Sequence, residues 1–477
     1  MDPIRVNPDS FEPQNHFYPR VLNAQIHPMV AHFFEMGTAR IVERYTHLHP
    51  EVDTKKIQEI LTHMTKYFRW GGADLFSATT STGIRKIIVI ETNSCPSGMK
   101  SMPFGSDPYV QSGYRSVIEQ TFLPMLKRRK LPKGDLAVLY DKNLMETSGY
   151  AAMLAELSGE PVWLVPFHHT DPNPPARFTE DGILEIRTAV DEWRPIRAAF
   201  RYVTQRPWNR IPPTTRTAIL NPVLVCLAGG RNKLLAAKAY DLHNALLRGT
   251  GLSIRTPETI WDVSKNEIPL WVQRMGGIAV IKDPYSNAGQ GVFTITNSEE
   301  LDHFMTLSFR YDRFIVQSLV GNSDWSSQMT QGRFYHLGTI PNRKGAIYAA
   351  DMRFMVGVDH NGFYPLAIYA RRANKPLMAQ LDGSVPSWEM LGTNLSVKKD
   401  DGSWDTETNR LLLMDGRDFN KLGVGLDDLI EGYIQTILSV TAIDEMAKQL
   451  VTQKGMFRRR LFRSLNPDPS LVDDIIA

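Results

Sequence analysis

The spacing of hydrophobic residues divides the chain into helices and short buried strands. Ile57, Ile60 and Leu61 recur at the spacing of one helix face. Asp53 stands just before this stripe, where a side-chain oxygen accepts hydrogen bonds from the first free amides of a helix. The sequence therefore predicts helices across residues 27–68, one of them beginning after Asp53.

A strand–helix–strand pattern follows. The runs LAVLYD, residues 136–141, and VWLV, residues 162–165, are short and apolar, as buried strands are. The helical pattern between them ends at Gly159, a residue type favoured just past a helix C-terminus. Short links between strand, helix and strand indicate parallel pairing. With the strand IRAAFRY, which ends near Arg201, they predict a Rossmann-like subdomain over residues 130–225.

The rest of the chain has the patterns of hairpins, helices and an antiparallel sheet. Strands are predicted at 86–93, 279–282, 292–295 and 314–320, and helices at 232–247, 298–307 and 420–454. Residues 333–374 alternate as antiparallel strands do, and Lys344-Gly345 and Asn361-Gly362 suit their turns. The combination indicates an α/β (α+β) fold.

Composition narrows the class of protein. The chain has 477 residues, whereas a single core stops growing at about 250–300 residues, so we expect several subdomains. The hydrophobic (42%) and charged (22%) fractions are those of a globular protein, and no apolar run reaches the ~18–20 residues of a membrane-spanning helix. Lys+Arg (54) nearly balance Asp+Glu (51), unlike in a dedicated nucleic-acid binder. We therefore expect neither a membrane nor a nucleic acid as partner.

The cysteines and the N-terminus bear on location. Only Cys95 and Cys226 are present, which favours a reducing compartment, although a single disulfide between them stays open. The N-terminal MDPIRVNPDS lacks a basic start followed by an apolar stretch, so no secretory signal is predicted. We expect a cytoplasmic protein.

The most informative motif for chemistry is VIETN, at the end of a predicted strand. Glu91 and Asn93 are two residues apart, so both side chains point to one face of the sheet. Their oxygens suit a hard cation such as Mg²⁺. Asp74 would add a third oxygen if its segment, RWGGADLF, paired with this strand as a hairpin. The alternatives are a solvated strand end for the pair and a turn for Asp74.

A glycine-rich loop follows the strand AVIK, which ends at Lys282. Backbone amides of such a loop can lie over phosphates, and a lysine adds a point charge. Lys233, at the start of an earlier helix, would add a second one. Gln317 stands where a hinge would meet an adenine edge. The spacing is not that of a Walker A motif, and an ordinary hairpin turn is the alternative.

Arginines recur on the last predicted strands. Arg353 alternates with Asp351 onto one sheet face, whereas the neighbours Arg371 and Arg372 must face opposite sides. Arginines that face a phosphoryl group stabilise its transfer, and surface ion pairs are the alternative. Asn394 follows in a Gly-Thr-Asn turn.

In this order the motifs resemble the circularly permuted ATP-grasp ligases, such as eukaryotic glutathione synthetase and glutathionylspermidine synthetase. The resemblance spans roughly residues 69–400 and implies a circularly permuted ATP-grasp fold with a Rossmann-like pre-ATP-grasp subdomain. The segments would be N-terminal helices and metal strand (1–125), Rossmann-like substrate subdomain (130–225), nucleotide-binding lid (226–322), and core sheet with C-terminal helices (323–477).

Together the motifs and the resemblance assign candidate roles. The candidates for Mg²⁺ are Asp74, Glu91 and Asn93; for ATP, Lys233, Lys282, Ala288, Gly289, Gln290, Gly291 and Gln317; for phosphoryl transfer, Arg353 with one of Arg371 and Arg372; and for substrate, Arg69, Ser94, Ser97, Arg201 and Asn394.

The resemblance implies an ATP- and Mg²⁺-dependent, ADP-forming ligase. It would phosphorylate a small amino-acid or peptide-like acid to an acyl phosphate, which an amine converts into an amide or peptide bond. A phosphotransferase on the same fold and a non-catalytic ATP-binding module are the alternatives. The loop YSNAGQG lacks the carboxylate that helps hold metal in the two named enzymes, which leaves the number of metal ions open. The oligomeric state is also open, with a homodimer among the options.

Overall fold

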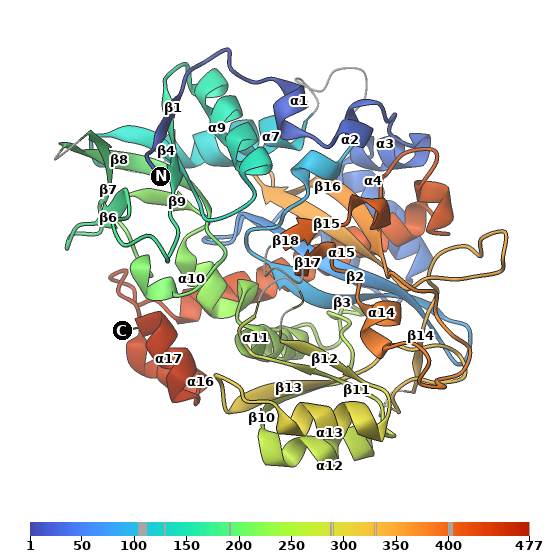
Figure 1. Cartoon of the computed structure of the whole chain (residues 1–477). Helices are drawn as coiled ribbons and strands as arrows, with labels where there is room; N and C mark the ends of the chain where they lie inside the picture. Colours follow the sequence, from blue (N-terminus) through green and yellow to red (C-terminus); the bar gives the residue numbers. More distant parts are fainter. Residues whose placement is uncertain are drawn as a thin grey trace.

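Three large sheets organise the molecule (Figure 1). The computed structural model describes residues 1–103, 112–127, 130–189, 192–286, 289, 291–328, 330, 332–398 and 404–476. The sheets have seven, six and four strands, and a separate two-stranded ribbon joins β17 (Ser396–Lys398) to β18 (Trp404–Thr406). Helices pack around them, so the α/β class predicted from the sequence is confirmed.

The seven-stranded sheet contains the predicted strand–helix–strand unit. Its order is β1 (Ile4–Val6), β5 (Val162–Pro166), β4 (Asp135–Tyr140), β8 (Glu192–Tyr202), β7 (Leu184–Ala189) and β6 (Ala176–Phe178), with β9 (Ala218–Leu220) also paired to β8. The central strands β5, β4, β8 and β9 are parallel, as the short links predicted. Helix α9 (Leu144–Ser158) ends at Gly159, whose φ of 69° is the left-handed conformation that glycine adopts without strain.

The six-stranded sheet is antiparallel. Its strands run in the order β14 (Phe334–His336), β2 (Trp70–Thr80), β15 (Ala350–Val358), β16 (Phe363–Arg372) and β19 (Leu411–Leu412), with β3 (Arg85–Asn93) also paired to β2. The predicted hairpin of β2 and β3 is present and sets Asp74 opposite Glu91. Asn361-Gly362 joins β15 to β16, whereas β14 pairs with β2 rather than with β15, so Lys344-Gly345 does not close a hairpin.

Helix α15 (Leu426–Gln449) covers one face of this sheet, and the other face carries charged side chains beside a small apolar cluster. Alternation along each strand explains the division, because successive side chains point to opposite faces. Leu75 and Phe354 lie against the α15 glycine Gly432, whereas Asp74 and Arg353 point the other way. The N-terminal helices α3 (Pro28–Glu35), α4 (Gly37–Leu48) and α5 (Thr54–Leu61) also pack on α15. As predicted, Asp53 caps α5 by accepting from the amides of Lys55 and Lys56.

The four-stranded sheet and the two helices that cover it form two layers. Its order is β10 (Thr259–Ser264), β13 (Arg313–Ser318), β11 (Ala279–Lys282) and β12 (Val292–Ile295), and helices α12 (Ile268–Arg274) and α13 (Ser298–Thr306) cover its outer face. Ala279 and Ile281 belong to the core under these helices. The alternate side chains, Val280 and Lys282, therefore face the opposite side, toward the rest of the molecule.

Helix α11 (Lys233–Leu246) links the sheets, and Asn232 caps it by accepting from the Leu235 amide at 3.2 Å. The shorter elements are α1 (Pro13–His16), α2 (Pro19–Leu22), η1 (Met99–Ser101), α7 (Gly113–Ser116), η2 (Val117–Phe122), α8 (Leu123–Lys127), η3 (Trp208–Arg210), α10 (Val223–Val225), η4 (Cys226–Gly230), η5 (Lys265–Glu267), α14 (Ser387–Leu391), η6 (Thr408–Arg410), η7 (Phe419–Lys421), α16 (Arg459–Leu465) and α17 (Pro469–Ile476).

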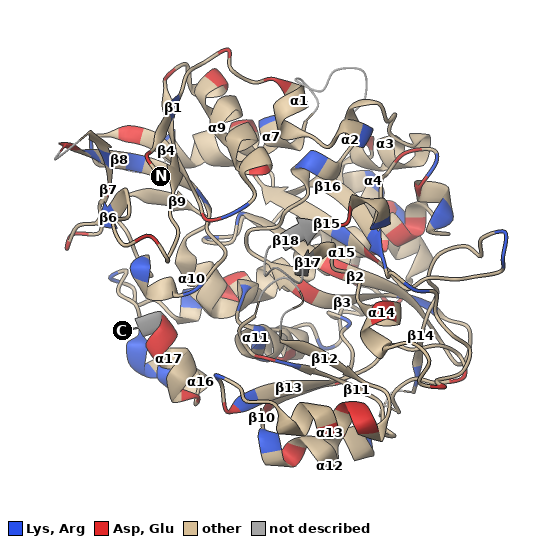
Figure 2. Cartoon of the chain, viewed as in Figure 1, with Lys and Arg blue, Asp and Glu red and all other residues tan. Residues whose placement is uncertain are grey.

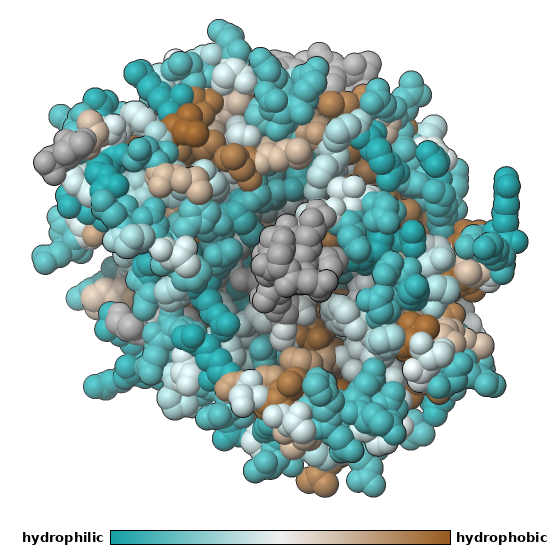
Figure 3. Space-filling model, viewed as in Figure 1, coloured by the Kyte–Doolittle hydropathy of each residue, from teal (hydrophilic) through white to brown (hydrophobic). Residues whose placement is uncertain are grey.

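Charges of both signs are spread over the helices and strands in the view of Figure 2. In the same view, hydrophilic residues occupy most of the surface, with separate hydrophobic patches (Figure 3). Among the described residues, no helix is both long enough and apolar enough to cross a membrane.

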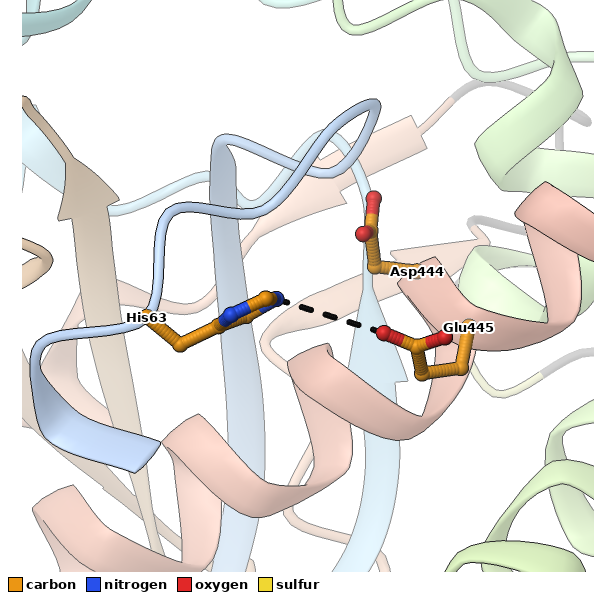
Figure 4. Close-up of side chains that lie close together, drawn as sticks. All are labelled: His63, Asp444 and Glu445. Carbon is orange, nitrogen blue, oxygen red and sulfur yellow. Dashed lines mark ion pairs between the residues drawn. The ribbon is translucent and has the colours of Figure 1, made fainter. Parts of the chain in front are cut away.

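Asp444, on α15, anchors the loop that leads into β2. Its fully buried carboxylate accepts hydrogen bonds from the amides of Lys66, Tyr67 and Phe68 at 3.0, 2.7 and 2.9 Å. Figure 4 shows it beside His63 and Glu445, a trio with the residue types of a metal site. Because the Asp444 oxygens already accept from three amides, we interpret the trio as structural.

Replacing Asp444 tests this anchor. Asp444→Ala would leave three amides without their acceptor, so we expect the free energy of unfolding to fall by about 2–4 kcal/mol. The matched control, Glu445→Ala, removes a half-exposed carboxylate next door and should cost less than about 1 kcal/mol. Urea unfolding followed by circular dichroism measures both, and equal losses would contradict the anchoring role.

Candidate functional site

A cavity of about 820 Å³ is lined by side chains from all three large sheets. The predicted site residues that line it are Asp74, Glu91, Asn93, Ser97, Lys233, Lys282, Gly289, Gln317, Arg353, Arg371 and Asn394. Most of the candidates therefore meet in one place, although they lie far apart in the sequence.

The end of β3 lies beside the two predicted lysines. The Lys233 Nζ atom is 3.4 Å from the Glu91 carboxylate, and Lys282 Nζ is 3.4 Å from the carbonyl oxygen of Ile90, 192 positions away in sequence. Lys233 also donates to the carbonyl and hydroxyl oxygens of Ser286, both at 3.1 Å. One carboxylate and two ammonium groups thus share one wall of the cavity.

Two close approaches bring these segments together. Gly230, just before Lys233, packs so tightly on Ser94 that a Cβ atom there would lie 2.4 Å from the serine Cβ. The Ser94 amide donates to the Gly230 carbonyl at 3.2 Å. Asn221, fully buried after β9, accepts from the amides of Arg69 and Trp70 and donates to the Ser94 carbonyl. These contacts join the seven-stranded sheet and α11 to the ends of β2 and β3.

Burial and neighbouring charges shift the pKa values in this wall. Desolvation, with the Lys233 charge nearby, lowers the pKa of Lys282 to about 8, although Glu91 acts to raise it. Burial acts to raise the pKa of Glu91, but Lys233 and the other nearby cations outweigh it and the pKa is lowered. Glu91 is therefore ionised at neutral pH, and its carboxylate acts on both lysines.

Asn93 is the second oxygen donor that the sequence predicts for a cation. Its side chain is 3% exposed and lines the cavity, and its amide nitrogen has no hydrogen-bond partner among the described residues. This unpaired N–H donor would suit an acceptor such as a phosphate oxygen, and the oxygen of the same amide is a ligand type for a hard cation. A hard cation held by the Glu91 carboxylate and the Asn93 carbonyl oxygen fits these two side chains.

Asp74, the third predicted metal ligand, is engaged by arginines. Arg353 binds both of its oxygens, at 2.6 and 2.7 Å, and Arg371 lies 3.1 Å from one of them. Asp351 pairs with Arg371 on the adjoining strand. These four side chains form an alternating charge network on the floor of the cavity, so Asp74 orients arginines in this structure.

Only one of the neighbouring arginines reaches the cavity, as predicted. Arg371 lines it, whereas Arg372 faces the other side of the strand and lies over the Tyr348 ring. Arg371 is therefore the one of the two that can act in catalysis, and the candidate role of Arg372 was wrong.

The glycine loop is described in part. Ala288 and Gln290 lie outside the described residues. Gly289 lines the cavity and approaches Trp388 and Asn394, whereas Gly291 packs on Asp283 instead. Gln317 lines the cavity and donates to the Thr259 hydroxyl at 2.8 Å.

Three predicted substrate residues do not line the cavity. Arg201 is fully buried behind it and donates to the carbonyls of Asn221 and Val203. Ser94 is also fully buried, with its hydroxyl 3.1 Å from the sulfur of Cys226, which like Cys95 is a free thiol. Arg69 stands just before β2. These assignments came from motif position, which does not distinguish a side chain in the cavity from one behind it.

Ser97 does line the cavity, and buried side chains behind it fix its position. Its hydroxyl donates to Glu146 at 2.7 Å, and its carbonyl accepts from Arg353 and from the Tyr369 hydroxyl. Glu146 is fully buried and also accepts from the amides of Gly98 and Met99. The loop after β3 is therefore fixed by a buried carboxylate that the sequence analysis missed.

Four cations in the cavity wall were also missed: Lys100, Lys142, Arg206 and Arg231. For two of them the sequence does contain an indication of their position. Lys142 comes two residues after the end of β4, and Arg206 follows β8, and residues just past parallel strands gather at one edge of a sheet.

The comparisons with known proteins find distant likenesses only. No protein-family model and no curated protein matches this chain. A glutathione synthetase-like effector from Globodera pallida resembles it with 10% identity and a TM-score of 0.39, over 78% of this chain and 88% of that one. An ATP-grasp RimK domain protein from Sphaerobacter thermophilus resembles it with 13% identity and a TM-score of 0.28, over 49% of this chain and 90% of that one.

D-alanyl-alanine synthetase A from Vibrio cholerae resembles the chain with 11% identity and a TM-score of 0.29, over 50% of this chain and 89% of that one. These are the kinds of protein that the sequence was expected to resemble, and a circular permutation stays a prediction. At such TM-scores the likeness carries no weight for what the chain binds, which has to follow from the cavity itself.

Asp351→Asn tests the charge network. The change would remove one carboxylate from Arg371 inside the protein, and breaking such a buried pair costs about 3 kcal/mol of folding free energy. Glu185→Gln is the matched control, because its partner Arg177 is 53% exposed and a surface pair is worth less than about 1 kcal/mol. If the charge network does not stabilise the protein, chemical denaturation will show equal losses in the free energy of unfolding for the two variants.

Proposed function

We propose that this chain is an ATP- and Mg²⁺-dependent ligase that joins a carboxylic acid to an amine and releases ADP. The observation that supports this most strongly is the meeting of Glu91, Lys233 and Lys282 in one cavity lined by three sheets. An acid beside two lysines is the set of charges that a metal-bound polyphosphate requires.

The two lysines would bind the phosphates. Lys282 projects from the inner face of β11, and Lys233 opens α11, so each comes from a rigid element. Glu91 is the lining acid beside them, Asp283 and Asp74 also act on their charges, and a polyphosphate would balance the positive charge that remains in the cavity. Gln317, on the neighbouring strand β13, has an amide that can read the edge of a base.

Glu91 and Asn93 would hold the magnesium ion through a carboxylate and an amide oxygen. Mg²⁺·ATP held there would supply the γ-phosphoryl group, which the substrate carboxylate takes with release of ADP. The amine would then attack the acyl carbon and displace inorganic phosphate, leaving the amide. Arg353 and Arg371 stand on the floor of the same cavity, and Asp74 and Asp351 hold their guanidinium groups in fixed orientations. Oriented cations stabilise charge that develops during phosphoryl transfer without further rearrangement.

A non-catalytic ATP-binding module is the second candidate, and one observation favours it. Of the three carboxylates among the described lining residues, Asp74 and Asp351 are both held by arginines. Glu91 is then the one lining acid that no arginine holds, whereas phosphoryl transfer often uses more than one carboxylate around its metal ions.

Lys282→Met tests nucleotide binding. Losing one charge-assisted contact to phosphate, worth about 1.5–3 kcal/mol, should weaken binding of a non-hydrolysable ATP analogue by about 10–100-fold. Lys344→Met, which removes an exposed lysine from a turn, should leave the affinity unchanged. Calorimetric titration gives both constants, and equal affinities would remove Lys282 from the site.

Glu91→Gln tests catalysis. With the carboxylate gone, we expect Mg²⁺-dependent ADP release in the presence of an acid and an amine to fall by more than about 100-fold, since electrostatic groups in active sites contribute that much. Binding of the ATP analogue without Mg²⁺ should persist.

The unmodified chain decides between the two candidates. ADP release that requires both acid and amine supports the ligase, whereas tight ATP binding without ADP release from any acid–amine mixture supports the module. Turnover that survives in Glu91→Gln at saturating Mg²⁺ would show that the metal assignment is wrong.

A further inference from the structure

The cavity is far more basic than the chain as a whole. Over the full sequence, Lys+Arg and Asp+Glu are nearly equal, at 54 and 51. The described residues that line the cavity include eight basic side chains, Lys100, Lys142, Arg206, Arg231, Lys233, Lys282, Arg353 and Arg371, against three acidic ones, Asp74, Glu91 and Asp351. The excess of positive charge is therefore local.

The three acids all belong to the six-stranded sheet. Asp74 and Asp351 pair with Arg353 and Arg371, and Glu91 lies beside Lys233. None of these pairs involves Lys100, Lys142, Arg206 or Arg231. We call these four cations the basic wall.

The basic wall lies where a sheet of this kind binds ligands. Lys142 follows the parallel strand β4 and Arg206 follows β8, and in open sheets ligands bind just beyond the carboxyl ends of parallel strands. His169 and Gln205, from the loops after β5 and β8, also line the cavity. Polar side chains thus surround these cations.

Three other acids lie near the basic wall but do not line the cavity: Asp141, Glu146 and, beside Arg206, Asp283. Asp141, next to Lys142, is buried, lies outside the cavity lining and accepts from the amides of Thr204 and Gln205. Glu146 lies under Lys100 and partly balances its charge, although burial still lowers the pKa of Lys100. Among the described residues, no ion pair joins a lining carboxylate to Lys142 or Arg206, whereas the charge of Arg231 acts on Glu91 and its guanidinium donates to the Cys95 carbonyl.

Lys142 is the clearer of these two cases. It makes no hydrogen bond and no ion pair with any described residue, and desolvation together with the Arg231 charge lowers its pKa to about 8, against the pull of Asp141. Among the described residues, Arg206 donates to the Tyr311 hydroxyl and the Tyr285 carbonyl, and its nearby acid, Asp283, does not line the cavity. Cations crowded together in a partly buried wall are unfavourable until an anion joins them.

We propose that the basic wall is the acid-substrate subsite, and that it selects acids carrying at least one anionic group in addition to the carboxylate that is activated. The extra group is a carboxylate or a phosphate, since both pair with lysine and arginine. Polyamines and singly charged acids are disfavoured at this wall. The inference rests on the proposed ligase function, whose substrate class it specifies.

Matched ligands test the subsite on the full chain without nucleotide. Glutarate and its monoamide, glutaramate, differ by one charge at nearly constant shape, and O-phosphoserine and serine form the corresponding phosphate pair. We expect the more highly charged member of each pair to bind at least tenfold more tightly in calorimetric titration. Preference within one pair alone identifies the extra group as carboxylate or as phosphate.

A matched pair of variants places the preference at the wall. Lys142→Gln should weaken glutarate binding at least tenfold, the effect of losing one charge-assisted hydrogen bond, and should leave glutaramate binding nearly unchanged. Lys55→Gln, an exposed lysine on α5, should change neither. Melting temperatures of both variants show whether they are folded.

Four results would contradict the proposed subsite. Two come from the ligands: equal affinity within both pairs, or no binding of any dianion at 10 mM (about 2.7 kcal/mol of binding free energy). The others are tighter binding of spermidine than of glutarate, and a preference for glutarate over glutaramate that is unchanged in Lys142→Gln. Binding of the ATP analogue is measured separately. Its absence would overturn the proposed ligase function while a dianion preference still supported the anionic subsite, so the two failures are distinguishable.

Discussion

The candidate site depends on one electrostatic constraint, the placement of the Glu91 carboxylate beside the ammonium groups of Lys233 and Lys282. These residues come from three segments, and the contacts of Gly230 with Ser94 and of Asn221 with the start of β2 hold those segments in register. Because Glu91 and the two lysines are largely buried, unlike charges attract strongly there and like charges repel strongly. The described lining of the cavity has more basic than acidic side chains, and a polyphosphate with its magnesium ion would balance this positive excess.

Much of this site follows from local patterns in the sequence. Alternation along a strand predicts that Glu91 and Asn93 share a face, that Arg353 shares one with Asp351, and that only one of two adjacent arginines reaches it, and the structure bears out each point. The strand–helix–strand unit and its parallel pairing follow in the same way, because short links leave few other topologies. Such features depend on neighbours in sequence, which a single chain displays.

The errors concern contacts between distant segments. Position after a strand does not reveal whether a side chain enters the cavity, so Arg201 and Ser94 were assigned to it although both are buried behind it, whereas Lys142 and Arg206 were passed over. Asp74 was expected to bind metal because its own hairpin brings it near Glu91, but its arginine partners lie about 280 and 300 positions away, beyond any local pattern. Glu146 escaped notice for the same reason, since its partners lie in the loop after β3.

The most direct test of the central claim is a crystal structure of the chain with Mg²⁺ and a non-hydrolysable ATP analogue. The account requires the phosphates to contact Lys233 and Lys282, with the metal ion held by Glu91 and Asn93 at oxygen–magnesium distances of about 2.1 Å. A nucleotide bound away from these lysines, or a metal ion coordinated without Glu91, would contradict it.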